Sequence, residues 1–132
     1  MDSGLYIAVF HLAAERRIGV GRLGTFDFAA GVYLYVGSAQ RNLRARLARH
    51  GRRRKPLRWH VDYLSTKATM LGAILIDGDR DRECRLAADL ARLYGRAAER
   101  FGASDCRCAG HLFYAGRWVE NSRDERRGTQ MG

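Results

Sequence analysis

The sequence predicts an α/β (α+β) domain with a small central antiparallel sheet of three or more strands flanked by helices. Near the N-terminus, β-branched and aromatic residues are concentrated in short runs with partial alternation, which is typical of strands. Beyond residue 41, leucines recur at the three- and four-residue spacing of amphipathic helices. The chain has 132 residues, enough for one compact domain with a single core.

The first three strands are expected to form an antiparallel meander, because short connections favour pairing between successive strands. They are predicted at Gly4–His11, Ile18–Leu23 and Gly31–Gly37, with residues 24–30 as a loop. Helices are predicted at Asn42–Arg49, Arg58–Ser65 and Arg82–Arg100, the last being the longest, and a further strand at Ala68–Ile76. Residues 112–114 are short and apolar, so the domain is expected to span residues 1–116 and residues 117–132 to form a polar, disordered tail.

The chain is strongly basic, with 24 lysine and arginine residues against 14 acidic ones. Genomic base composition can enrich arginine, but such enrichment would be spread along the chain. Here nine basic residues and no acidic residue lie between positions 41 and 58, which favours a polyanionic partner over a solvated face. The predicted contacts to nucleic acid, and to DNA in particular, are Arg41, Arg44, Arg49, Arg52, Arg53, Arg54, Lys55 and Arg58.

The sequence gives no sign of export. The apolar run Leu5–Ala14 is too short to span a bilayer and has no positive flank before it. Three cysteines, an odd number, argue against a disulfide framework. We therefore expect a cytoplasmic protein, associated with the nucleoid if it acts on DNA, with no membrane and no disulfide-linked partner.

An ordered set of motifs resembles the GIY-YIG endonuclease family. Gly4-Leu5-Tyr6 lies on the first predicted strand, Tyr35-Val36-Gly37 on a later one, and Arg46 within the helix that follows. An alternative tripeptide, Gly31-Val32-Tyr33, lies on the same strand as Tyr35 and is less suitable. The later segments WHVDYL, EC, SDCRC and HLFY are similar to the DUF123 proteins, one branch of that family.

This resemblance implies a metal-dependent endonuclease. It implies catalytic roles for Tyr6, Tyr35, Arg46 and His50, and a role for Glu83 as ligand of one Mg²⁺ or Mn²⁺ ion. Strand alternation requires Tyr6 and Tyr35 to point to the same side of the sheet as the helix of Arg46. The substrate would be DNA, at a flap, a branch or a lesion of the kind met in DNA repair.

The residue types suit this chemistry independently of the family. Phosphodiester hydrolysis needs a deprotonated water and cations that neutralise the phosphoryl oxygens. A tyrosine is a poor base near neutral pH unless cations stabilise its phenolate. A single carboxylate such as Glu83 suits Mg²⁺, which keeps several waters in its shell. Each residue also has an ordinary structural alternative. The tyrosines could pack in the core, Arg46 could be solvated, His50 could pack near the helix end, and Glu83 could stabilise a helix N-terminus.

Two other groups leave alternatives open. Cys84, Cys106, Cys108 and His111 are four potential ligands of a structural zinc, although their Cys-x-Cys-x-x-His spacing is uncommon. His60 and Asp62 either contact nucleic acid or form a hydrogen-bonded pair that supports the sheet, and we favour support. The competing functions are a non-catalytic nucleic-acid-binding module and a zinc-stabilised interaction domain.

Overall fold

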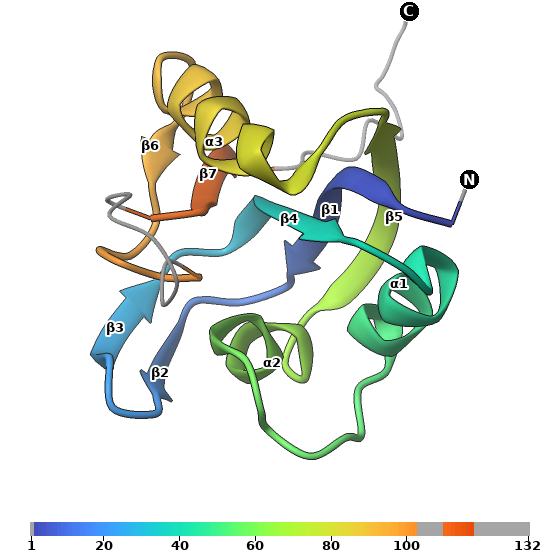
Figure 1. Ribbon diagram of the computed structural model, residues 1–132. Coiled ribbons are helices and arrows are strands. Elements are labelled where there is room, and N and C mark those ends of the chain that lie inside the picture. Colours follow the sequence, from blue (N-terminus) through green and yellow to red (C-terminus); the bar gives the residue numbers. More distant parts are fainter. Residues whose placement is uncertain (1, 103–109, 118–132) are drawn as a thin grey trace, which may run out of the picture.

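The computed structural model describes residues 2–102 and 110–117, which form a five-stranded antiparallel sheet, a separate two-stranded sheet and three α-helices (Figure 1). The strand order of the larger sheet is β5-β1-β4-β7-β6, and β2 pairs with β3 in the smaller one. The strands are β1 (Gly4–Leu12), β2 (Arg16–Val20), β3 (Gly24–Phe28), β4 (Gly31–Ala39), β5 (Thr69–Ile76), β6 (Gly95–Arg96) and β7 (Leu112–Gly116). The helices are α1 (Leu43–Gly51), α2 (His60–Ser65), the 3₁₀ turn η1 (Arg80–Arg82) and α3 (Glu83–Ala91).

Side-chain alternation along β1 gives the large sheet two apolar faces. Tyr6, Ala8 and Phe10 belong to the main core together with Leu43 of α1 and residues of α2. Ile7 lies in a second, smaller cluster with Val36, Phe113 and Ala87 of α3. Helices α1 and α2 therefore cover one face of the sheet, and α3 covers the other (Figure 1).

The predicted meander is wrong, because the second strand, β2 at Arg16–Val20 instead of Ile18–Leu23, pairs with neither of its predicted neighbours. The segment expected to be a loop is strand β3, which pairs with β2, so β1 pairs directly with β4. Residues 24–28 alternate polar and aromatic side chains, and Phe28 is buried against Tyr33 and Phe101. Gly21, with φ 49°, supplies the turn that joins the two short strands. The hairpin is thus an insertion between two adjacent strands of the sheet.

The longest predicted helix is also wrong, because α3 ends at Ala91. Leu86 and Leu90 pack on the sheet as the apolar stripe requires, but Leu93 is 74% exposed. Gly95 and the residue after it instead form β6, which pairs with β7. Glycine is a poor helix former, and pairing with the edge of the sheet satisfies the main chain at this point.

The remaining predicted elements are confirmed. Strands β1, β4 and β5 and helices α1 and α2 lie where the periodicity places them, within two residues at most boundaries. The predicted tail from residue 118 onwards lies outside the described residues. Within the described part of the chain, no helix is both long enough and apolar enough to cross a membrane.

Candidate functional site

The two tyrosines of the tripeptides lie side by side on the face covered by α1 and α2. Tyr6 of β1 is opposite Gly37 of β4, and Ala8 is opposite Tyr35, so both tyrosines point to the same face. Their ring centroids are 6.4 Å apart. A side chain at position 37 would collide with the hydroxyl of Tyr6, which explains why glycine follows Tyr35-Val36 here.

A buried imidazole contacts the first tyrosine. His50, near the end of α1, lies 2.7 Å from the hydroxyl of Tyr6 through its Nε2 atom. Burial, assisted by the charge of Lys55, lowers the pKa of His50 to about 4, so the ring is neutral at pH 7. Burial also raises the pKa of Tyr6 and of Tyr35 above the usual range, although Arg46 opposes this shift at both residues. Both phenols are therefore protonated, and the neutral imidazole is positioned to exchange a proton with Tyr6.

Arg46 reaches the same place from α1. Its guanidinium donates a hydrogen bond of 2.6 Å to the carbonyl oxygen of Ser38 and lies 5.0 Å from the centre of the Trp59 ring. Its charge, close to the hydroxyl of Tyr6, lowers the pKa of that phenol and so favours the phenolate. Arg46 is thus held by neutral partners, and no carboxylate of the described residues forms an ion pair with it.

Glu83 approaches from the opposite side, at the start of α3. Its Oε1 atom accepts a hydrogen bond of 2.5 Å from the hydroxyl of Ser38, and its Oε2 atom lies 2.8 Å from Nδ1 of His111. Burial alone would raise the pKa of Glu83, but the contacts with His111 and Ser38 and the charge of Arg80 lower it overall. The carboxylate is therefore ionised, and its side chain remains 21% exposed.

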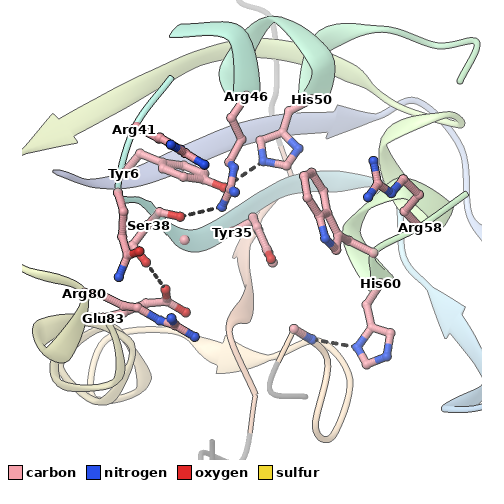
Figure 2. Close-up of a pocket in the computed structure, with 14 residues that line it drawn as sticks. Tyr6, Tyr35, Ser38, Arg41, Arg46, His50, Arg58, His60, Arg80 and Glu83 are labelled. Carbon is pink, nitrogen blue, oxygen red and sulfur yellow. Dashed lines mark hydrogen bonds between the residues drawn. The ribbon is translucent and has the colours of Figure 1, made fainter. Parts of the chain in front are cut away.

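These side chains converge on one pocket (Figure 2). The cavity has a volume of 430 Å³ and is lined by all five residues to which the family resemblance gives a role: Tyr6, Tyr35, Arg46, His50 and Glu83. Four arginines line it as well as one carboxylate, counting the described residues; the arginines are Arg41, Arg46, Arg58 and Arg80. Such an excess of positive charge suits an anionic ligand, and phosphate in particular.

The structure divides the predicted nucleic-acid contacts into two groups. Arg41 and Arg58 line the pocket, whereas Arg44 is exposed on α1, and Arg52, Arg53 and Arg54 are exposed just after that helix. Arg49 instead forms a salt bridge of 2.7 Å with the buried Asp62. Lys55 is 1% exposed and donates hydrogen bonds to the carbonyl oxygens of Arg49 and His50. These last two cations stabilise the end of α1.

His60 and Asp62 both make supporting contacts, but not with each other. Asp62 is buried and accepts hydrogen bonds from Arg49 and from the main-chain N–H groups of Arg58 and Trp59. Nδ1 of His60 accepts a hydrogen bond of 2.9 Å from the N–H of Gly102. Asp62 thereby fixes the start of α2, and His60 anchors the loop beyond β6.

Sequence reasoning missed three residues of the site: Ser38, Trp59 and Arg80. Ser38 links the two halves of the pocket, because its carbonyl oxygen accepts from Arg46 and its hydroxyl donates to Glu83. The guanidinium groups of Arg46, Arg49 and Arg58 lie within 5.8 Å of the Trp59 ring centre. The position of Trp59 within the basic run was a usable signal for this stacking. Nothing local in the sequence marks Arg80.

The zinc hypothesis falls partly outside the described residues, because Cys106 and Cys108 lie there. Of the other two candidate ligands, Sγ of Cys84 lies 3.9 Å from Nε2 of His111, whose Nδ1 faces Glu83. In residues 2–102 and 110–117 no group of three or more histidine, cysteine, aspartate or glutamate side chains is arranged to hold a metal ion.

The comparison with known families agrees with one part of the sequence interpretation. Residues 5–129 match DUF123, a domain of unknown function. The chain belongs to the DUF123 family. The match continues past residue 116 and so includes most of the segment that was interpreted as a tail. No curated protein and no solved structure is significantly similar to the chain.

Proposed function

We propose that this DUF123 protein is a metal-dependent endonuclease of the GIY-YIG type, which hydrolyses a phosphodiester bond of nucleic acid, and of DNA in particular. One observation carries the proposal. Side chains from β1, β4, α1 and α3 that the motif resemblance singles out line the same arginine-rich pocket. A core of strand tyrosines alone would not require an ionised carboxylate and four guanidinium groups at the same place.

The Tyr6–His50 pair is suited to activating a water molecule. When the imidazole carries its proton on Nδ1, the hydroxyl of Tyr6 donates to Nε2 of His50. Tyr6 can then accept a proton from a water molecule while its own proton moves to His50. A bound phosphate brings negative charge to the pocket, which raises the pKa of His50 from its low value toward neutrality. Tyr35 has no imidazole at hydrogen-bond distance, so we assign it to orienting the water or the phosphate.

Arg46 and the other pocket arginines hold the scissile phosphate. No carboxylate in the described part of the chain pairs with Arg46, so a phosphoryl oxygen is its natural counter-ion. Arg41 and Arg58 lie on the pocket lining and are suited to the neighbouring phosphates of the strand. Positively charged groups held in place before the reaction stabilise the transition state without reorganising.

The residues present fit one divalent ion. Among the described residues, Oε1 of Glu83 contacts Ser38 and Oε2 contacts His111, which leaves lone pairs on the carboxylate for a metal. The carboxylate is ionised and lines the pocket. Mg²⁺ or Mn²⁺ bound there would act as a Lewis acid toward the phosphate, with waters completing its shell.

A cleavage assay tests the proposal. The protein is incubated with branched, nicked, abasic and single-stranded substrates in the presence of Mg²⁺ or Mn²⁺, and with a chelator as the blank. We expect metal-dependent cleavage, which Glu83→Gln abolishes while binding to DNA persists. Asp89→Asn is the matched control, because Asp89 is an exposed carboxylate on the same helix. Wild-type cleavage by Glu83→Gln would remove this carboxylate from the mechanism.

The tyrosines need a separate comparison. Tyr6→Phe deletes only a hydroxyl and should lower the rate by roughly 10²-fold, with little change in stability. Tyr63→Phe, outside the pocket, is the control. If Tyr6→Phe and Tyr35→Phe both cut at the wild-type rate, these residues have no catalytic role. A wild type that binds these substrates but cuts none of them would instead favour a non-catalytic nucleic-acid-binding module.

A further inference from the structure

Strand β5 forms one edge of the large sheet (Figure 1). It pairs with β1 on one side, and no other strand of the described chain pairs with it on the other. Its sequence, TMLGAILI, has no charged residue. Three of its large apolar side chains are exposed: Leu71 by 45%, Ile74 by 53% and Leu75 by 44%. The edge therefore offers both unpaired main-chain groups and apolar side chains.

An edge of this kind is uncommon in a protein that remains monomeric. Edge strands are normally protected by a charge, a proline or a bulge. In β5 the pairing with β1 is irregular between Met70 and Gly72, but it is regular from Gly72 to Ile76. That regular part has no protecting charge, so it is available to a second strand.

The charges at the two ends of β5 are of opposite sign. Lys67 precedes the strand, and Asp77 and Asp79 follow it. All three are exposed, and none forms an ion pair within the described part of the chain. If two copies of β5 lie antiparallel, Lys67 of each copy comes beside Asp77 and Asp79 of the other. The arrangement repeats by two-fold symmetry, so both ends are attractive.

The middle of the strand also suits self-pairing. In an antiparallel pair centred on Ala73, Ile74 of one copy lies opposite Gly72 of the other. Nothing lies within 4 Å of the position that a side chain on Gly72 would occupy. Each Ile74 side chain can therefore extend over the Gly72 that faces it toward the other Ile74, and Leu71 lies opposite Leu75 of the other copy.

We propose that the protein forms a two-fold symmetric homodimer through antiparallel pairing of β5 with β5 of a second copy, which joins the two five-stranded sheets into one. The inference does not depend on the proposed function, because it uses neither the pocket nor its residues. The partner is taken to be a second copy, because the opposite charges at the two ends of the strand complement each other when the strand pairs with itself.

Sedimentation velocity over a concentration series, in physiological salt and without nucleic acid, tests the dimer. We expect the wild type to dimerise and Ile74→Lys to raise the dissociation constant by roughly 100-fold or more, since it places two lysines at the symmetry axis. Leu93→Lys is the control, because Leu93 is even more exposed but does not lie on β5. A wild type that is monomeric throughout, or equal effects of the two variants, would overturn the proposal.

Charge reversal tests the two-fold geometry. Lys67→Glu alone, and Asp77→Lys with Asp79→Lys in one chain, should each raise the dissociation constant by roughly tenfold, because both ends become repulsive. Lys67→Glu lowers the net charge of the chain, so general repulsion predicts the opposite result. A mixture of the two variants should form heterodimers of wild-type affinity, since both ends are again attractive. Failure of the mixture to recover would exclude this pairing.

Discussion

Arg46 and Arg49 lie one turn apart on the same helix, and both stack on the Trp59 ring, at 5.0 and 4.5 Å from its centre. The two guanidinium groups differ in their polar partners. Arg49 reaches the buried carboxylate of Asp62, which neutralises it, whereas Arg46 reaches a carbonyl oxygen and a phenol. Identical residue types at neighbouring positions therefore have different capacities: one cation is compensated within the protein, and the other remains available to an anionic ligand.

The comparison separates structural cations from functional ones within a single basic run. Removing a compensated cation leaves a buried carboxylate with fewer partners, so the cost falls on stability. Removing an uncompensated one relieves repulsion among cations and leaves the fold intact, so any cost falls on the ligand. We therefore expect the loss of Arg49 to lower stability and the loss of Arg46 to lower activity.

The largest expected effect is on cleavage by Arg46→Ala. If Arg46 stabilises charge on the scissile phosphate, its removal should lower kcat/KM by roughly 10²- to 10³-fold. Arg49→Ala should change kcat/KM by less than about tenfold per folded molecule, since its guanidinium faces Asp62. Single-turnover kinetics on a substrate from the cleavage panel measures both. Equal losses of kcat/KM in the two variants would mean that the different partners of Arg46 and Arg49 have no consequence for catalysis.

His50 should make stability depend on pH. Its pKa is about 4 in the folded protein, against an ordinary value of 6.5, because burial disfavours the charged ring. The unfolded chain therefore binds a proton first as the pH falls, so this contribution to stability is complete above pH 6.5 and is lost toward pH 4. The loss is about 3 kcal/mol in all. His60, whose pKa is also lowered by burial, acts in the same direction.

Urea denaturation at several pH values measures this dependence. Stability should fall by about 1.4 kcal/mol per pH unit within the window. His50→Gln cannot take up the proton and should flatten the slope there, even if its stability at pH 7 is lower. An unchanged slope in His50→Gln would show that another group titrates.

Arg49→Ala should destabilise the fold by about 2 kcal/mol, because Asp62 loses its closest cation but keeps its main-chain donors. Arg46→Ala should cost less than about 1 kcal/mol. Chemical denaturation of the two variants at pH 7 gives the comparison directly. A larger loss of stability in Arg46→Ala would reverse the roles inferred from their partners.

Much of the site could be predicted from the sequence because ordered motifs resemble those of the GIY-YIG family and lie on elements with strong local patterns. The β-branched and aromatic run of β1 and β4 fixes which tyrosines share a face, and the leucine spacing of α1 fixes the phase of Arg46. The resemblance points to Glu83 at the start of the last predicted helix, and the error at the far end of that helix does not move this residue.

The errors come from tertiary pairing that no local pattern contains. Strand β3 exists because it pairs with β2 and because Phe28 packs on Phe101, which is far away in the sequence. Helix α3 stops where β6 can pair with β7. In the same way, Arg49 cannot be distinguished from Arg46 in the sequence, because Asp62 lies on a different helix. Partners distant in the chain decided each of these cases.

The smallest effect per residue concerns the exposed arginines of the loop after α1. Arg52, Arg53 and Arg54 are exposed, and their contacts with DNA would be chiefly ionic. If about five phosphates are neutralised in all, log K should fall against log salt with a slope of roughly −4 to −5. Arg53→Ala should make this slope less steep by about 0.9 and weaken binding at low salt for every DNA sequence alike.

Arg49→Ala is the control for this measurement, because its charge is compensated by Asp62 and its removal should leave the salt slope unchanged. Fluorescence anisotropy with a non-cleaved duplex, titrated at several salt concentrations, gives the slopes. A slope near zero in the wild type would mean that the basic run does not meet a polyanion. Equal changes in the two variants would mean that Arg49 binds phosphate although it is paired with Asp62. Pairing with a carboxylate would then not distinguish structural arginines from DNA-binding ones.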